Sequence, residues 1–199
     1  ASLLFDTATA TAETNSSTLG IFNYKMNLTG SLATNPKFRS VESTVTIASV
    51  TDGTSNTAVF SETRRSPLAA TATASNLTDR NVIHRLSSWD VTVDNYAPRI
   101  PDCDTSTQTV LPYRGQQYYR GQQFVSTYGH TVPPNYKGFD CMDTYWGVGH
   151  LAARSYHSGG VNVGMADGSV KFVKDSVSLQ TWRALGTKAG GEIISADSL

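Results

Sequence analysis

The clearest structural signal in the chain is a pair of alternating segments that reads Val161-Asn162-Val163-Gly164-Met165-Ala166-Asp167-Gly168-Ser169-Val170-Lys171-Phe172-Val173. Apolar residues alternate with polar or small ones on both sides of the Asp-Gly pair, which is the period of β-strands. An Asp-Gly pair between two such segments favours a type I′ turn, because both of its central residues need positive φ. The sequence therefore predicts a hairpin that pairs Met165 with Val170 and Val163 with Phe172, all four on one buried face.

Elements on both sides of this hairpin follow from local patterns. Alternation upstream predicts strands over 38–47 and 57–62, separated by the turn-rich run 51–56. Downstream, apolar residues at three-residue steps predict a helix capped by Asp175 or Ser176 and stopped by Gly186; these apolar residues are Leu179, Trp182 and Leu185. The tail from 188 to 197 is expected to turn into a last short strand.

These elements predict an α+β fold, with a predominantly antiparallel β-sheet, one or two short helices and long loops. Residues 1–18 are small and polar without an apolar period, and we expect a flexible arm or linker there. Residues 19–199 are expected to form a single β-rich domain, since a chain of this length can bury a core without help from metals.

Composition narrows the location and the partners. The chain carries 16 Lys and Arg against 16 Asp and Glu, and this zero net charge gives no support for nucleic-acid binding. Charged residues make up 16%, below the usual quarter, and Thr, Ser, Asn, Gly and Tyr take their place, as in many extracellular β-proteins. No run of eighteen apolar residues occurs, so no membrane contact is expected from this segment itself. We expect a secreted, periplasmic or cell-surface protein.

The two cysteines fit the same compartment. Cys103 and Cys141 both lie in Asp-flanked, loop-like contexts. Two exposed thiols would be a liability outside the cell, whereas one disulfide is ordinary there. The expectation is a Cys103–Cys141 disulfide, and the alternative is two unrelated reduced cysteines.

Several motifs give the chain a family resemblance. His157 stands nine residues before Asp167-Gly168, within the run 156–170, and Trp182-Arg183-Ala184-Leu185-Gly186-Thr187 and Gly190-Gly191-Glu192 follow. Asp52-Gly53-Thr54-Ser55-Asn56-Thr57 and Pro133-Pro134-Asn135 precede them. In this order the motifs resemble the prepilin-type proteins abundant in planctomycete bacteria, over about residues 50–197.

The resemblance implies a pilin- or pseudopilin-like globular domain. Members typically begin with a prepilin peptidase site and a long apolar helix, and neither is present in this chain. The function it implies is a non-enzymatic structural or assembly module that works through protein partners or self-assembly. No cofactor is expected.

The matched motif residues are interpreted as structural: His157, Gly159, Gly160, Asp167, Gly168, Asp52, Gly53 and Asn56. We expect His157 to fix the bend at Gly159-Gly160 through a backbone carbonyl. The alternative, a metal ligand or base, lacks a neighbouring partner at ligand spacing. A calcium site is a further alternative, and the pseudopilin resemblance supports it. Its candidate ligands are Asp52, Asn56, Asp167 and Asp175. The competing interpretation is that these residues only form turns.

A second function remains open in the aromatic middle of the chain. Rings there stand beside Arg and Gln, a mixture suited to a polysaccharide or another ligand; the candidate residues are Tyr113, Arg114, Tyr119, Arg120, Tyr145 and Trp146. The competing interpretation is that most rings belong to the core. A third hypothesis is a hydrolase, although no Gly-x-Ser-x-Gly, phosphate loop or Cys-x-x-Cys occurs and no catalytic residue is predicted.

Overall fold

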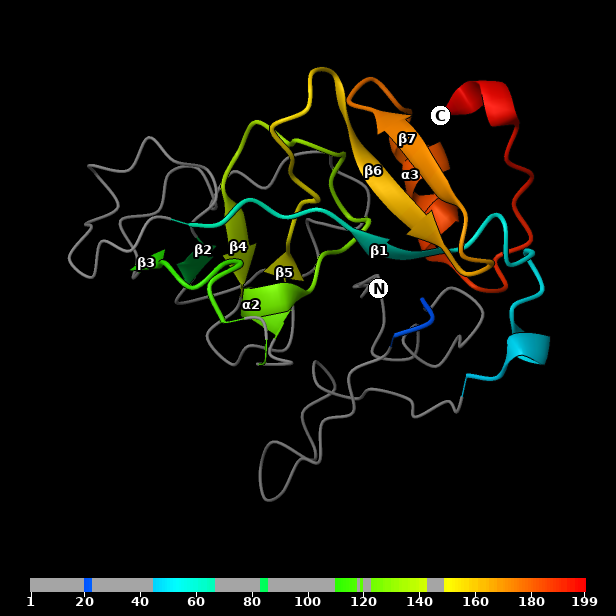
Figure 1. The fold of residues 1–199 in the computed structure, drawn as a ribbon, viewed down its shortest axis with the longest axis horizontal. Helices are drawn as coiled ribbons and strands as arrows, with labels where there is room; N and C mark the ends of the chain where they lie inside the picture. Colours follow the sequence, from blue (N-terminus) through cyan, green and yellow to red (C-terminus); the bar gives the residue numbers. More distant parts are fainter. Residues whose placement is uncertain are drawn as a thin grey trace, which may run out of the picture.

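The predicted hairpin forms the centre of a three-stranded antiparallel sheet. We describe a computed structural model, and it defines residues 20–22, 45–66, 83–85, 110–117, 119, 123–142 and 149–199. The strands β1 (Ala58–Ser61), β6 (Gly160–Met165) and β7 (Val170–Lys174) lie in the order β1-β6-β7. A second, mixed sheet lies beside the first (Figure 1). The α+β prediction is confirmed.

The register of the hairpin differs from the prediction by one residue. Val161 pairs with Val173, Val163 with Lys171, and Gly164 with Val170. A one-residue slip moves every side chain of one strand to the opposite face. Val173 is therefore fully buried, while Val170 and Phe172, which were predicted to face the core, are 67% and 46% exposed.

The cause of the slip is the turn. Met165 N–H donates to Ser169 O at 2.8 Å, and Gly168 N–H donates to Met165 O at 3.0 Å, so the loop has three residues instead of two. Gly168 has a φ of 87°, whereas Asp167 does not have positive φ. This is a type I turn followed by a left-handed glycine, the common three-residue alternative to type I′.

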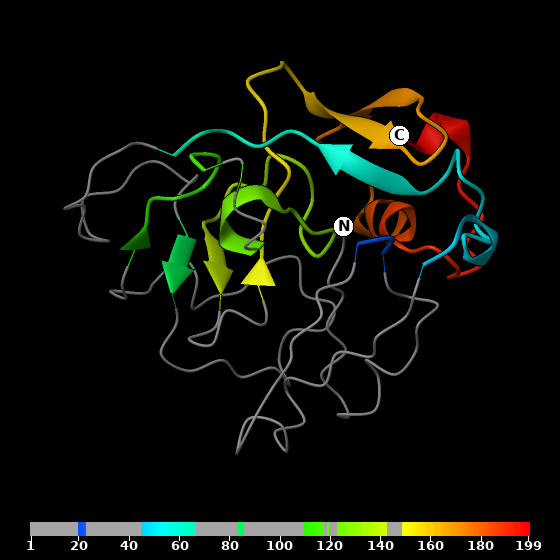
Figure 2. The ribbon, with the colours of Figure 1, turned by 60° about the horizontal axis from the view of Figure 1, so that its bottom comes forward.

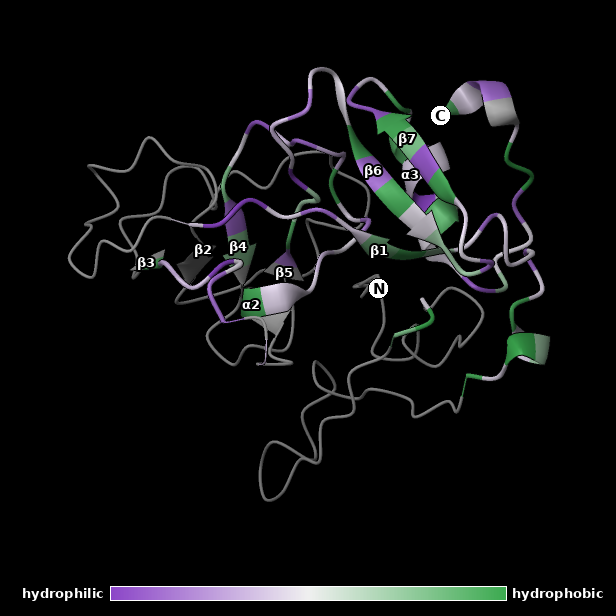
Figure 3. Ribbon diagram, in the orientation of Figure 1, coloured by the Kyte–Doolittle hydropathy of each residue, from purple (hydrophilic) through white to green (hydrophobic). Residues whose placement is uncertain are grey.

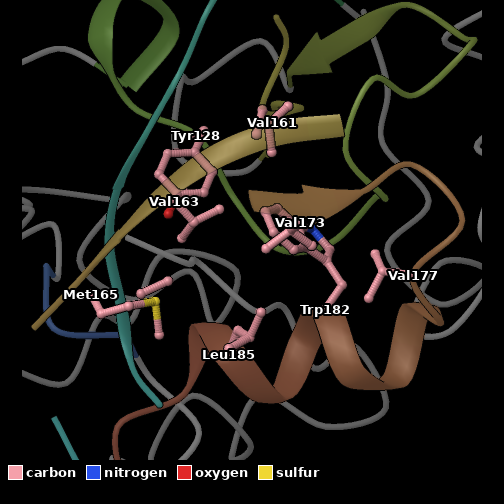
Figure 4. Close-up of a cluster of buried hydrophobic side chains, with 10 residues drawn as sticks. Tyr128, Val161, Val163, Met165, Val173, Val177, Trp182 and Leu185 are labelled. Atoms are coloured by element: carbon pink, nitrogen blue, oxygen red, sulfur yellow. The ribbon is translucent and has the colours of Figure 1, made fainter. Parts of the chain in front are cut away.

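The helix α3 (Leu179–Gly186) covers one face of this sheet (Figure 2). Its N-cap is Ser178, which accepts from Thr181 N–H at 3.0 Å, and not Asp175 or Ser176 as predicted. The predicted apolar stripe is confirmed, because Trp182 and Leu185 are buried and Leu179 packs on the core. Figure 4 shows most of this core cluster, which comprises Ala58, Tyr128, Ala153, Val161, Val163, Met165, Val173, Val177, Trp182 and Leu185.

The second sheet is formed by short segments between residues 83 and 150, in the order β3-β2-β4-β5. Its strands are β2 (Ile83–Arg85), β3 (Val110–Leu111), β4 (Asp140–Met142) and β5 (Gly149–His150), and a single turn of helix, α2, spans Gln123–Ser126. Strands β2 and β4 pair in parallel, and the other pairs are antiparallel. These strands are two or three residues long, too short to show a period in sequence.

The ends of the domain differ from the sequence prediction. Of the expected strand over 38–47, the end at Ile47–Ser49 is a turn of 3-10 helix, and 38–44 lie outside the described residues. Strand 57–62 is confirmed as β1. The expected last strand is wrong, because 187–195 pair with no strand and 3-10 helix follows at Ala196–Ser198. The predicted arm, 1–18, also lies outside the described residues. None of the helices in the described part of the chain has the length and apolar character needed to cross a membrane.

Candidate protein-contact surface

The sheet β1-β6-β7 has one covered face and one exposed face. Along β6, the inward residues are buried against α3, and the residues between them point the other way. The pairing partners of those outward residues therefore share the exposed face. We define this outer face as Phe60, Asn162, Gly164, Val170, Phe172 and Lys174.

Apolar side chains dominate one end of the outer face. Phe60 is 67% exposed on β1, and Val170 and Phe172 stand on β7. Gly164 on the central strand separates them, and a Cβ built there would lie 3.5 Å from Cβ of Phe60. Figure 3 shows hydrophobic residues along all three strands, and these include the residues that face the core. Since single exposed apolar residues are normal but clusters mark contact sites, this grouping is the candidate surface.

Glu62 accepts hydrogen bonds at the polar end of the outer face. Its two carboxylate oxygens accept from Asn162 N–H at 2.9 Å and from Asn162 Nδ2 at 3.2 Å. Ser61 Oγ donates to Asn162 O at 2.9 Å. Burial raises the pKa of Glu62, but the hydrogen bonds from Asn162 and His157 outweigh it, so the net pKa is lowered. These side chains continue the β1–β6 pairing beyond the end of β1.

His157 reaches the same carboxylate. Its Nε2 lies 2.9 Å from Glu62 Oε1, and its backbone N–H donates to Ser155 Oγ at 3.1 Å. The predicted partner, a backbone carbonyl, is replaced by a carboxylate that is distant in sequence. His157 is 55% exposed at its side chain, so this contact lies at the surface, and the role of His157 in fixing the bend at Gly159-Gly160 stays a prediction.

The two Asp-Gly motifs meet in space. Asp167 N–H donates to Thr54 O at 3.1 Å and Ala166 N–H to Thr57 O at 2.9 Å. Asp167 Oδ1 accepts from the N–H of Ser169 at 2.9 Å and from its hydroxyl at 2.7 Å. These side-chain bonds lower the pKa of Asp167. Its carboxylate therefore closes the turn.

Asp52 also has a local structural task. Its carboxylate accepts from the N–H groups of Gly190 and Gly191, both at 2.8 Å, and from Thr187 Oγ1 at 3.0 Å. Asn56 Nδ2 donates to the carbonyl oxygen of Asp52 at 3.2 Å. The upstream motif therefore holds the segment that follows α3, with Gly53 at its turn.

The Pro-Pro-Asn turn joins three further segments. Asn135, with a φ of 50°, donates from Nδ2 to Asp175 Oδ1 at 2.7 Å and to Gly160 O at 3.3 Å. Its Oδ1 accepts from Ser155 N–H at 2.8 Å. Gly160 lies so close to β7 that an added Cβ would be 2.3 Å from Val173 O. Asp175 is thus bound to an amide at the opposite end of the hairpin from Asp167.

A buried ion-pair network lies on the side of the second sheet. Asp140, fully buried on β4, pairs with Arg114 Nε at 3.3 Å and with Arg154 Nη2 at 2.9 Å. Arg114 also donates to the carbonyls of Thr127 and Ala152. Burial lowers the pKa of Arg114, against the opposing effect of Asp140. The predicted ligand-binding role of Arg114 conflicts with this complete burial, because its guanidinium group contacts Asp140 and two backbone carbonyls inside the domain.

A buried histidine that the sequence did not single out completes the core. His130 Nδ1–H donates to Trp182 O at 2.6 Å, and the two rings lie 4.0 Å apart between centroids. Burial lowers the pKa of His130 to about 3. Gly186 leaves room for this ring, since an added Cβ would be 2.6 Å from its Cγ. Gly186 is the last residue of α3 and does not have positive φ, so glycine is needed here for close packing and not for the left-handed helix stop that the sequence predicted.

Other predicted ligand residues are only partly placed. Tyr113 and Tyr119 are 39% and 70% exposed. Arg120, Tyr145 and Trp146 lie outside the described residues. Within the described residues, two of the six predicted ligand residues, Tyr113 and Tyr119, are therefore exposed at the surface.

The calcium candidates are not gathered at one point. Asp175 contacts Asn135, while Asp52 and Asp167 each accept from N–H and hydroxyl donors near the other end of the hairpin. Within the described ranges, no group of three or more His, Cys, Asp or Glu could hold a metal ion. Asp52 and Asp167 act as hydrogen-bond acceptors for turns.

Of the two cysteines in the predicted disulfide, the structure describes Cys141. Cys141 is fully buried on β4, a strand and not the exposed loop that its sequence context indicated. It is not a free thiol. Cys103 lies outside the described residues, so the pairing stays a prediction.

Sequence patterns did not single out Glu62, His130, Asp140 and Arg154, and they marked Asn135 only as part of a turn motif. Of these, Asn135 carried a signal in its Pro-Pro-Asn turn. The others pair with residues far along the chain, and Glu62 with Asn162 is an example at 100 positions. No local spacing marks such contacts.

Comparison with known proteins gives one match. The model of the family SBP_bac_10, described as "Protein of unknown function (DUF1559)", matches residues 4–180. No curated protein and no solved structure matches the chain. Since the match covers most of the sequence, the chain belongs to the DUF1559 family.

Proposed function

We propose that the protein is a non-enzymatic structural or assembly module, secreted or exposed on the cell envelope, that acts through protein–protein contacts. The observation that carries this proposal is the outer face, where Phe60, Val170 and Phe172 stay exposed on an otherwise well-packed sheet. Clustered exposed aromatic and aliphatic side chains gain free energy when a partner covers them.

The finer assignment is to the prepilin-type, pseudopilin-like class. It rests on the order of the motifs, which the contacts between Asp52, Asp167 and their neighbours explain as one connected scaffold. In this class the globular domain follows a prepilin peptidase site and an apolar helix. The coding sequence upstream of Ala1 tests this assignment, since a different kind of leader or domain there would contradict it.

The polar groups of the described motifs support a structural role over chemistry. Asp52 and Asp167 accept from backbone N–H groups, and Glu62 accepts from Asn162. A general base or nucleophile needs a group poised toward a substrate, whereas these carboxylates are directed at the protein's own backbone.

Photo-crosslinking in the producing cells tests the proposal. A photoreactive phenylalanine analogue is placed at Phe60 or at Val170, and a matched control at Ile193, which is 100% exposed and outside the outer face. We expect discrete protein adducts from the two outer-face positions and none from position 193. Adduct yields at both positions no higher than at 193 would contradict the proposal.

A second candidate is polysaccharide binding through Tyr113 and Tyr119. Their exposure favours it, because tyrosine rings provide flat contact area with a polar edge. Affinity electrophoresis in gels cast with cell-wall polysaccharide tests it. Retardation that disappears in Tyr113→Ser/Tyr119→Ser, but not in Phe60→Ser/Phe172→Ser, would favour this function over the first.

A further inference from the structure

Strand β7 is an edge of the sheet that the described residues form, since the order is β1-β6-β7. Antiparallel pairs alternate between hydrogen-bonded and non-hydrogen-bonded residues. Met165 N–H bonds to Ser169 O, and Asp175 N–H bonds to Gly159 O, both at 2.8 Å. The alternation between these two bonds makes Lys171 and Val173 the residues of β7 that bond to β6.

The remaining residues of β7 direct their backbone groups away from β6. These are Val170, Phe172 and Lys174, and their side chains are all exposed. Among the described residues, the bond recorded to these outward groups is from Val177 N–H to Lys174 O, at 3.1 Å. The edge thus presents open donors and acceptors beside two exposed apolar side chains, which is the pattern that receives an added strand.

We propose that β7 pairs antiparallel with β7 of a second copy of this chain, about a two-fold axis at Phe172. This inference rests on the proposed function and names its partner. Each Phe172 would exchange N–H···O bonds with its counterpart, and Val170 would lie opposite Lys174 of the other copy. The two outer faces would then form one continuous surface across a six-stranded sheet.

The charges of β7 are compatible with this register. Lys171 would lie opposite Val173, and Lys174 opposite Val170, so that no lysine faces a lysine. Moving the axis to Lys171 would place the two Lys171 side chains directly opposite each other, which is unfavourable. At Phe172, the axis instead brings two exposed rings together as a cross-strand aromatic pair.

Two features make the pairing reversible. The strand has five residues, so the area buried is at the small end of specific interfaces. Lysines on an edge strand also oppose indiscriminate pairing. We therefore expect association at high local concentration, as in an assembled surface structure, and a monomer when the protein is dilute.

Cysteine crosslinking tests both the partner and the register. In the proposed pair, the two Cα atoms at position 172 are about 5.5 Å apart, within disulfide range. The two at position 170 are four residues out of register, about 14 Å apart. With a mild oxidant at high protein concentration, we expect Phe172→Cys to form a covalent dimer, and Val170→Cys and the parent chain to stay monomeric.

A second pair of variants tests the hydrogen bonds. Phe172→Pro removes the outward N–H without touching the ladder to β6, a position where edge strands tolerate proline. Phe172→Ala also removes the ring but keeps the N–H. In concentrated solution, sedimentation should show association for the parent chain, weaker association for the alanine variant and none for the proline variant, each checked for a retained melting transition.

The outcomes separate this inference from the proposed function. No dimer from Phe172→Cys, or equal dimer from Val170→Cys, overturns the β7 pairing. If outer-face photo-crosslinking nevertheless yields adducts to other proteins, the proposed function stands with a different partner. If both experiments are negative, the inference and the proposed function fail together.

Discussion

The backbone N–H of Asp167 donates to the carbonyl oxygen of Thr54 at 3.1 Å, and this bond joins the two Asp-Gly motifs of the chain. One motif closes the β6–β7 hairpin, and the other anchors the segment after α3 through Asp52. Two motifs more than a hundred residues apart therefore form one loop cluster at one end of the sheet.

Replacement of Gly168 should damage this cluster. Gly168 has a φ of 87°, which a β-branched residue strongly resists. We expect Gly168→Val to lower the free energy of unfolding by about 1–3 kcal/mol. Gly168→Asn is the matched control, because asparagine tolerates the left-handed region. Equal urea midpoints for the two variants would show that backbone strain at this turn is not the cause.

Sequence predicts this hairpin well but not its register. The alternation at 161–173 identified both strands, because burial on one face imposes a two-residue period. The register depended on whether Asp-Gly fills a two-residue or a three-residue loop, and the same pair of residues is compatible with both. That one difference moved Val170 and Phe172 from the core to the outer face.

Glu62 should matter more for stability than His157. Removing the carboxylate leaves the N–H of Asn162 without its acceptor, so Glu62→Ala should cost about 1–3 kcal/mol. His157→Ala breaks an exposed pair, and about 0–1 kcal/mol is expected. Urea unfolding of both variants checks the ranking. A larger loss from His157→Ala would mean that the imidazole, and not the carboxylate, holds the bend.

The candidate surface was harder to predict than the scaffold. The motif residues of the hairpin could be recognised because Asp-Gly pairs favour turns. Phe60 belongs to the outer face because it pairs with Gly164 on the neighbouring strand. Arg114 was predicted to be a surface residue because its sequence neighbours are tyrosines and glutamines. In the structure it is buried and forms an ion pair with Asp140. Long-range pairing decides both cases, and a single sequence does not contain it.

Acid should destabilise the protein through His130. Its folded pKa is about 3, because burial disfavours the imidazolium, while the unfolded value is near 6.5. Between these values the unfolded chain binds the extra proton, so stability is full above about pH 6.5 and falls toward pH 3. The slope per proton approaches about 1.4 kcal/mol per pH unit.

Chemical denaturation at pH 7, 6 and 5 checks this dependence. His130→Gln has no titrating ring, so its stability should change less over this range than that of the parent chain. The carboxylates with lowered pKa, Glu62 and Asp167, lose their contribution only at lower pH. Parallel curves for the two proteins would show that another group controls the acid response.

The Cys103–Cys141 disulfide should add substantial stability. It would close a long loop, and in the chain-entropy model such a cross-link contributes about 3–5 kcal/mol. Alkylation followed by intact-mass analysis, with and without reductant, tests it. In denaturant, which exposes the buried Cys141, we expect no label without reductant and two labels after reduction. Two labels on the denatured, unreduced protein would contradict the pairing.

Gly186→Ala should destabilise the domain although alanine is the better helix former. Intrinsic propensity favours alanine by about 1 kcal/mol inside a helix. At this position, however, the added Cβ would lie 2.6 Å from Cγ of the buried His130 ring. That ring is hydrogen-bonded to Trp182 O and lies tilted against the Trp182 ring, with 4.0 Å between the centroids, so it has little freedom to move. Overpacking of this kind typically costs about 1–3 kcal/mol.

The double variant separates this clash from any other effect of the substitution. Gly186→Ala/His130→Ala relieves the clash, so its loss should be smaller than the sum of the two single losses, giving a favourable coupling energy. Gln180→Ala, at an exposed position of α3, is the control and should melt close to the parent chain. If Gly186→Ala melts at or above the parent temperature, the His130 ring can move aside, and Gly186 is then not required for the packing of α3 against His130.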